Sequence, residues 1–189
     1  MSPGASGEPG DRPAGARIPL PDEARRALTA WRAAGDRIVF TNGVFDLLHR
    51  GHAEYLAKAR AFGERLVVGV NSDASVRRLK GQTRPIVVAA DRAALLEALA
   101  CVDLAVIFDD DTPARLIEAV RPDVLVKGGD WVVEQIVGRE FVESQGGRVL
   151  SIPLREGCGT TVLVERIREV GTTTCAREQL LASLAGARP

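Results

Sequence analysis

The two histidines of this 189-residue chain lie three residues apart, in the segment His49-Arg50-Gly51-His52. An apolar run typical of a strand precedes them, and a helical pattern begins near Gly51. At a helix start this spacing allows both imidazoles to face the same side of the first turn. There they could donate hydrogen bonds to a phosphate on which charge develops, the main requirement of phosphoryl-type transfer. A lone histidine at a helix start is usually a cap or a surface group, but two histidines in one unit favour the catalytic interpretation.

The same segment has the form of an anion-binding turn. A strand that runs through a glycine-containing turn into a helix presents free backbone N–H groups and a positive helix end at the edge of a sheet. Gly51 lacks a side chain, which would let a triphosphate approach the backbone closely. The segment matches neither a P-loop nor the dinucleotide-binding glycine pattern.

A basic run follows the second apolar strand. Lys80 could lower the cost of gathering phosphate charges, because a flexible ammonium interacts with several oxygens. The alternative is a solvated basic surface, which we expect for Arg77 and Arg78. Arg84 and Arg92 are weaker candidates for ligand contacts.

Two later segments also end strands or begin helices with polar residues. An apolar strand ends in Lys127 and Gly128, at a place where open α/β sheets carry ligand contacts. Trp131 could stack on a ring or merely cover the sheet edge. Thr160 and Thr161 precede the last core helix, where their hydroxyls and N–H groups could bind an anion. Cys158, in the same turn, is interpreted as a packing residue.

The elements that must position these residues alternate along the chain. Short apolar runs predict strands at Arg37–Thr41, Arg65–Val70, Leu104–Phe108, Val124–Val126 and Arg148–Ile152. Periodic stretches predict a leading helix after Pro21 and helices at His52–Phe62, Ala90–Ala100, Pro113–Val120, irregularly within Glu134–Gln145, and at Thr161–Val170. This alternation predicts a doubly wound, Rossmann-like α/β fold with a five-stranded, mostly parallel sheet and helices on both faces.

The composition excludes several classes of protein. The formal net charge is zero, which is atypical of a nucleic-acid-binding protein, and no apolar run is long enough to span a membrane. Three scattered cysteines and the absence of a signal-peptide pattern favour a cytoplasmic protein, and His and Cys are too few for a structural zinc site. We expect a disordered tail over residues 1–17, one domain over 18–170, and a linker with a short helix over 171–189.

The order and spacing of these motifs resemble the H-x-G-H nucleotidyltransferases, in their cytidylyltransferase-like branch. Within it the chain is most similar to adenylyltransferases that make ADP-heptose from ATP and D-glycero-β-D-manno-heptose 1-phosphate. The similarity covers roughly Arg37 to Glu169. It is carried by Thr41–His52, Asn71–Asp73, Arg78–Gly81, Arg84–Pro85, Val126–Asp130 and Gly157–Thr161. Many such proteins fuse this unit to a sugar kinase, and the present chain resembles the stand-alone form.

The resemblance implies a role for each matching residue. His49, His52 and Lys80 would hold charge in the transition state of transfer from ATP to a sugar 1-phosphate. Nucleotide or phosphate contacts are implied for Thr41, Asn42, Gly43, Phe45, Gly51, Lys127, Gly128, Thr160 and Thr161. Asp46 and Asp130 match positions near the acceptor, although Asp46 could equally cap the coming helix. Mg²⁺ would arrive with the triphosphate, since no protein ligand for it is obvious. A homo-oligomer is also implied.

Two departures from the family pattern leave alternatives open. Gly159 stands where a serine is usual, and Ile86–Asp91 is less polar than its counterpart. One alternative is a cytidylyltransferase acting on glycerol 3-phosphate or a similar alcohol phosphate, and a further relative adenylylates a flavin phosphate. An alternative from another class is a non-catalytic nucleotide-binding protein, which would explain both departures.

Overall fold

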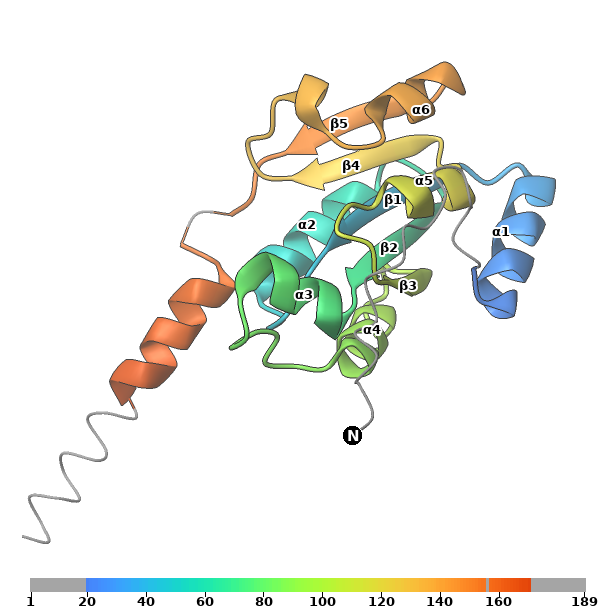
Figure 1. Ribbon diagram of the computed structural model, residues 1–189. Coiled ribbons are helices and arrows are strands. Elements are labelled where there is room, and N and C mark those ends of the chain that lie inside the picture. Colours follow the sequence, from blue (N-terminus) through green and yellow to red (C-terminus); the bar gives the residue numbers. More distant parts are fainter. Residues whose placement is uncertain (1–19, 156, 171–189) are drawn as a thin grey trace, which may run out of the picture.

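All five apolar runs form strands of one parallel sheet in the computed structural model, which describes residues 20–155 and 157–170 (Figure 1). The strands are β1 Ile38–Gly43, β2 Arg65–Asn71, β3 Leu104–Phe108, β4 Val124–Gly128 and β5 Arg148–Ile152. Their order is β3-β2-β1-β4-β5, and every neighbouring pair is parallel. The predicted doubly wound α/β fold is confirmed, with a sheet that is parallel throughout. The predicted terminal segments, 1–17 and 171–189, lie outside the described residues.

The helices follow the predicted order with shifted bounds. They are α1 Asp22–Ala34, α2 Arg50–Arg60, α3 Asp73–Lys80, α4 Ala89–Glu97, α5 Ala114–Val120, the short 3₁₀ helix η1 Val133–Gln135 and α6 Arg139–Ser144. Residues 160–170 are also helical. The irregular helix expected within Glu134–Gln145 is divided between η1 and α6. Helix α3 was not predicted, because its eight residues are mostly polar and bury only Ser75 and Val76.

The two faces of the sheet bury separate groups of apolar side chains, as the alternation along β1 requires. Phe40 packs in one cluster with Leu28 of α1 and Leu116 of α5. Val39, on the opposite face, belongs to a second cluster with Leu56 of α2 and Leu96 of α4. Burial on both faces explains why the strands are nearly continuous apolar runs.

The strand order creates a switch point beside β1, which pairs with β2 on one side and β4 on the other. The chain winds outward from β1 to β3 and then crosses to β4 and β5. In open α/β sheets, ligands bind in the crevice outside the carboxyl ends of the strands that flank such a point. Asn42, near the end of β1, and Lys127, near the end of β4, therefore lie at the expected place.

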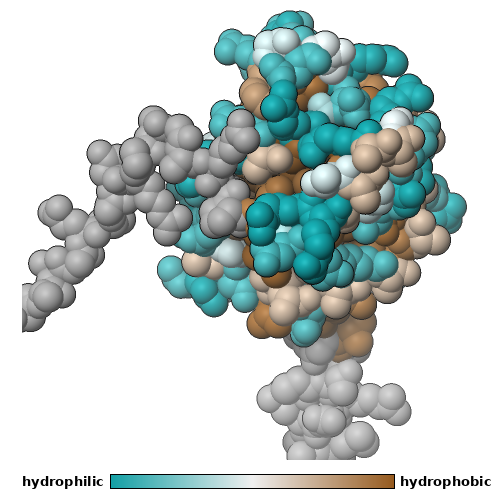
Figure 2. Space-filling view, turned by 90° about the vertical axis from the view of Figure 1, so that its right-hand side faces the viewer, coloured by the Kyte–Doolittle hydropathy of each residue, from teal (hydrophilic) through white to brown (hydrophobic). Residues whose placement is uncertain are grey.

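The surface that carries α1 is mostly hydrophilic, with smaller apolar areas between polar residues (Figure 2). Among the described residues, no helix combines the length and apolar character needed to cross a bilayer.

Candidate active site

A cavity of about 580 Å³ opens at the switch point. Its walls come from the β1–α2 turn, α3, the segment before α4, the end of β4 and the start of the last helix. The lining residues are Asn42, Val44, Phe45, Asp46, His52, Val76, Lys80, Arg84, Lys127, Gly128, Trp131, Leu154, Thr160 and Thr161. Nine of the fourteen residues predicted to form the site line this one cavity, although they come from four separate segments of the chain.

The histidine pair lies at the start of α2, with His49 as the extended N-cap residue and His52 in the first turn. The two rings stack, with centroids 3.8 Å apart and an interplanar angle of 20°. Phe45 approaches His52 edge-on, with ring centroids 5.2 Å apart. The Nδ1 atoms of both histidines are buried and have no hydrogen-bond partner among the described residues. Because buried polar atoms are normally paired, two unsatisfied ring nitrogens side by side are unusual in a folded protein.

Burial disfavours the charged forms of both histidines. Desolvation, and then the neighbouring His49, lower the pKa of His52 to about 4, and a hydrogen bond to the backbone of Leu47 partly opposes this shift. Desolvation also lowers the pKa of His49. Both rings are therefore neutral at pH 7. Phosphate oxygens nearby would act in the opposite direction, since a negative neighbour favours the charged form.

The sequence suggested that Gly51 lets a triphosphate approach the backbone, but in the structure Gly51 makes room for neighbouring protein atoms. A Cβ at this position would lie 2.9 Å from Cβ of Cys158 and 3.1 Å from Nδ1 of His49. The space beside the glycine is thus filled by protein, so its missing side chain allows the turn around Cys158 to pack against the H-x-G-H segment. The interpretation of Cys158 as a packing residue agrees with this contact.

Lys127 places a positive charge at the switch point. Its Nζ donates to Oδ1 of Asn42 at 3.2 Å and lies 5.7 Å from the ring centre of Trp131. No carboxylate of residues 20–155 or 157–170 forms an ion pair with it in the structure. Desolvation lowers the pKa of this ammonium. A partly buried cation without a counter-ion, at the expected ligand crevice, is suited to hold an anion.

The last helix directs its first turn at the same cavity. Residues 160–170 are helical, and Thr160 and Thr161 line the cavity from that helix start. The first N–H groups of a helix have no intrahelical acceptor and carry partial positive charge, which favours phosphate. A Cβ added to Gly159 would meet no atom within 4 Å, so the position where the family usually has serine is open space.

Comparison with known proteins agrees with this geometry. The model of the family described as "Cytidylyltransferase-like" matches residues 40–178. The chain belongs to the cytidylyltransferase-like family. It is 57% identical over 153 residues to the "Bifunctional protein HldE" of Geotalea uraniireducens (strain Rf4), a match that covers 81% of this chain and 31% of that one. It is 56% identical over 140 residues to the protein of the same name from Geobacter sulfurreducens, covering 74% of this chain and 29% of that one.

A solved structure shows the same fold and family. The lipopolysaccharide core biosynthesis protein of Thermoplasma volcanium is 30% identical, with a TM-score of 0.53 over 64% of this chain and 98% of that protein. The cytidylyltransferase-like chain thus spans nearly all of the Thermoplasma volcanium protein but less than a third of the HldE proteins.

Five predicted residues are not part of the cavity lining. Thr41 lies in the core of this cytidylyltransferase-like domain, where its Oγ1 is 2.6 Å from the hydroxyl of Tyr55. Its side chain is therefore unavailable to a phosphate. Asp130 is exposed, while Gly43 and Gly51 pack against neighbouring rings or Cys158. His49 does not line the cavity, but its ring stacks on His52, which does.

Asp46 anchors the segment before α4. Its Oδ1 accepts hydrogen bonds from the backbone N–H groups of Ile86 at 2.6 Å and Val87 at 3.0 Å. Its other oxygen accepts from the guanidinium of Arg84. The N-cap of α2 is His49, so the interpretation of Asp46 as the helix cap is wrong. Asp46 lines the cavity, but its carboxylate is already bound within the protein.

Arg92 has a structural role that the sequence did not reveal. Its side chain is fully buried and donates to Val87 O at 2.8 Å, Val44 O at 2.6 Å and Asp73 Oδ1 at 2.7 Å. These bonds, here called the Arg92 clamp, join the β1–α2 turn, the start of α3 and the segment before α4. A charged residue inside an amphipathic helix gives no sign of such burial, because its partners come from distant segments.

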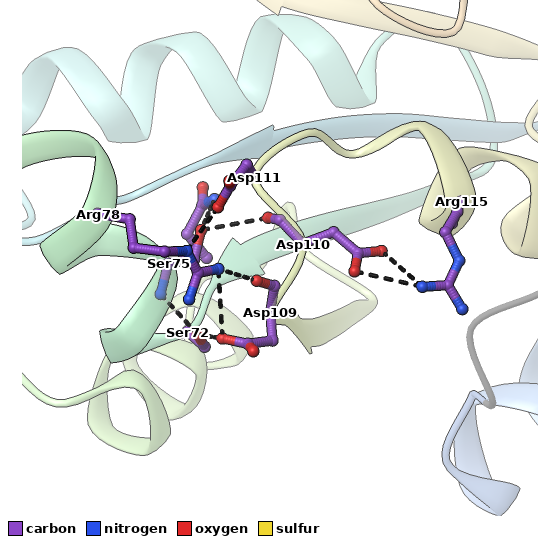
Figure 3. Close-up of polar contacts among 8 residues, drawn as sticks. Ser72, Ser75, Arg78, Asp109, Asp110, Asp111 and Arg115 are labelled. Atoms are coloured by element: carbon purple, nitrogen blue, oxygen red, sulfur yellow. Dashed lines mark hydrogen bonds and ion pairs between the residues drawn. The ribbon is translucent and has the colours of Figure 1, made fainter. Parts of the chain in front are cut away.

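Helix α3 is also held from the side of β3 (Figure 3). Ser72, its N-cap, accepts from Ser75 N and donates to Asp109. Arg78 pairs with Asp111 at 2.7 Å and donates to the Asp109 carbonyl, as expected for a surface arginine. These contacts fix the helix that ends in Lys80, which is exposed and lines the cavity. The lining residues that the sequence did not indicate are apolar, namely Val44, Val76 and Leu154. Leu154 could have been found from its place just after β5.

Among the described residues that line the cavity, Asp46 is the one carboxylate, and that group already binds Arg84 and two backbone N–H groups. Within residues 20–155 and 157–170, no group of three or more His, Cys, Asp or Glu side chains is arranged to hold a metal ion. The cations of the cavity suit phosphates instead.

Proposed function

We propose that this chain is an adenylyltransferase that forms an ADP-sugar and pyrophosphate from ATP and a sugar 1-phosphate, with D-glycero-β-D-manno-heptose 1-phosphate as the acceptor. The observation that carries the proposal is the stacked pair His49–His52, with two unpartnered buried nitrogens beside a cavity that also presents Lys80, Lys127 and a helix start. The identity of 57% to an HldE protein and the motif resemblance to ADP-heptose-forming enzymes support the choice of ATP and a heptose phosphate.

In the proposed reaction, an oxygen of the acceptor phosphate attacks the α-phosphorus of ATP in line. A P–O bond forms to the acceptor while the bond between the α-phosphorus and the bridging oxygen breaks, so that pyrophosphate leaves. His49 and His52 donate N–H groups to the α-phosphate, and Lys80 and Lys127 offset the charge of the gathered phosphates. No protein nucleophile is needed.

The remaining predicted contacts are proposed on the same basis. Asn42, Phe45, Gly128, Thr160 and Thr161 line the nucleotide and phosphate part of the cavity. Mg²⁺ is proposed to arrive bound to the triphosphate, because the one carboxylate among the described lining residues, Asp46, already binds Arg84 and two backbone N–H groups. We further propose a cytoplasmic location, where ATP is available, and a homo-oligomer, which size-exclusion chromatography with light scattering tests.

The experiment is pyrophosphate release from the purified chain with Mg²⁺ and D-glycero-β-D-manno-heptose 1-phosphate, run separately with ATP, CTP and GTP. We expect release with ATP alone. Release with CTP and not ATP would contradict adenylyl transfer and favour the cytidylyltransferase alternative, for which glycerol 3-phosphate is the second acceptor. Silence with every nucleotide and both acceptors would favour the non-catalytic nucleotide-binding alternative.

A further inference from the structure

A second, smaller cavity of about 90 Å³ adjoins the large one. Asn42, Lys127 and Trp131 line both cavities and form the wall between them. The far side of the small cavity consists of Pro113, Gln135, Ile136 and Val137, which come from the start of α5 and from η1 with the residues after it.

The two cavities differ in chemistry. His52, Lys80, Arg84 and the threonines of the last helix face only the large cavity. Apart from the shared Lys127, the small cavity presents two amides, an indole and aliphatic groups. The lining of the large cavity suits phosphates, whereas the lining of the small cavity suits an uncharged group that carries hydroxyls. Since both substrates must meet at one phosphorus atom, the uncharged end of the acceptor can extend past the shared wall while its phosphate stays in the large cavity.

The size of the small cavity limits what it can hold. About 10–15 Å³ of cavity volume is enough to hold one water molecule. A cavity of about 90 Å³ therefore has room for a small group of several heavy atoms. A heptose 1-phosphate differs from a hexose 1-phosphate in that its ring bears a two-carbon diol arm where the hexose has one hydroxymethyl group.

We propose that the small cavity binds this two-carbon diol arm and that Gln135 is the residue that selects heptose over hexose. This inference rests on the proposed function and adds the part of the acceptor that is recognised. The amide of Gln135 offers both a donor and an acceptor to the hydroxyls. Trp131 and Val137 contact the carbon atoms of the arm.

The wall that faces Gln135 is held in place before any substrate binds. The indole N–H of Trp131 donates to Gly128 O at 3.1 Å, and its backbone N–H donates to Ser151 Oγ at 3.2 Å. Ser151 in turn donates to the carbonyl of Gly129. Ile136, next to Gln135, is anchored in the apolar core. A fixed ring on one side and an anchored segment on the other define the cavity in advance, as discrimination of one small group requires.

The test compares kcat/KM for D-glycero-β-D-manno-heptose 1-phosphate and β-D-mannose 1-phosphate, each with ATP. Gln135→Ala is expected to lower the heptose value about 10-fold to 100-fold, the scale of a lost hydroxyl contact, and to leave the mannose value and KM for ATP unchanged. Val137→Phe, which fills the cavity, is expected to act in the same direction. Glu134→Ala changes an exposed neighbour that does not line the cavity and is the matched control with no expected effect.

Equal losses with both sugars, or an unchanged heptose preference in both variants, would overturn this assignment while leaving nucleotidyl transfer intact. Failure of the wild-type chain to release pyrophosphate from any triphosphate with either sugar is a separate result, because it would overturn the proposed function and this inference with it.

Discussion

Two walls of the large cavity use their charged side chains in opposite ways. On the wall built by α3 and the segment before α4, Asp46 pairs with Arg84, and Arg92 pairs with Asp73. On the switch-point wall, Lys127 has only an amide and an aromatic face as neighbours among the described residues, and the histidine pair has two unpartnered nitrogens. The paired charges of the first wall hold segments together, so their removal should lower stability. The groups of the switch-point wall are available to a ligand, so their removal should lower activity and leave stability unchanged.

The largest effect is expected at the Arg92 clamp. Arg92→Met leaves Asp73 and two backbone carbonyls without their buried partner, which typically costs about 3–5 kcal/mol of stability. Urea unfolding followed by circular dichroism measures the loss. Arg25→Ala is the control, since its ion pair with Asp22 is highly exposed and is expected to contribute little to stability. Similar stabilities of the two variants would show that the clamp does not hold this wall.

Lys127→Met, unlike Arg92→Met, should lower activity without lowering stability. Loss of a charge-assisted contact with phosphate is expected to lower kcat/KM for ATP about 10-fold to 100-fold. The free energy of unfolding should stay the same or rise, because the desolvated ammonium has no counter-ion among residues 20–155 and 157–170. Steady-state kinetics and urea unfolding of the same preparation give both values. A large loss of stability with unchanged kinetics would place Lys127 with the structural charges.

The burial of His52 should make the stability of the chain depend on pH. The pKa of His52 is about 4 in the folded chain and 6.5 for the ordinary side chain, so between these values the unfolded chain binds more protons. Its contribution to stability is therefore complete above pH 6.5 and is lost as the pH falls toward 4.

Urea unfolding at pH 7 and pH 4.5 tests this linkage in the wild type and in His52→Gln. The wild type should lose about 1–2 kcal/mol more than the variant over this interval, a figure reduced for the partial solvent exposure of the ring. Equal losses would mean that the ring is not desolvated.

The smallest effect is expected at the turn before the last helix. Gly159→Ser restores the hydroxyl that is usual in the family, at a position with room for a Cβ. The added hydrogen bond should lower KM for ATP by a factor of about 2–10, which corresponds to about 1 kcal/mol, with no loss of stability. Gly51→Ala is the contrasting variant, because its Cβ would collide with Cys158. A raised KM in Gly159→Ser would indicate that the open space is needed by the substrate.

The strands and most of the cavity could be predicted from the sequence, because local patterns determine where they form. Apolar runs predicted all five strands, and motifs at strand ends predicted most of the cavity, since parallel strands bring their carboxyl ends to one edge. Thr41 shows a limit of motif matching. It lies on the same face of β1 as Val39, so alternation directs it into the core, where Tyr55 binds its hydroxyl.

Other features depend on contacts that no local pattern contains. The spacing around Arg92 does not show that the carbonyls of Val44 and Val87 will converge on its guanidinium. Gln135 similarly has no sequence signal, because its cavity exists only where η1 meets the ends of two strands. Helix α3 is polar and short, so its stability comes from the contacts at Ser72 and Arg78 rather than from an apolar face.

Catalysis by the stacked histidines is tested most directly by kcat of His49→Ala and His52→Ala, measured together with the unfolding free energy of each variant. We predict that kcat falls by about 10²-fold or more in each variant, the scale of a lost preorganised donor, while the chain remains folded. Unchanged turnover in both folded variants would show that the two histidines are not catalytic.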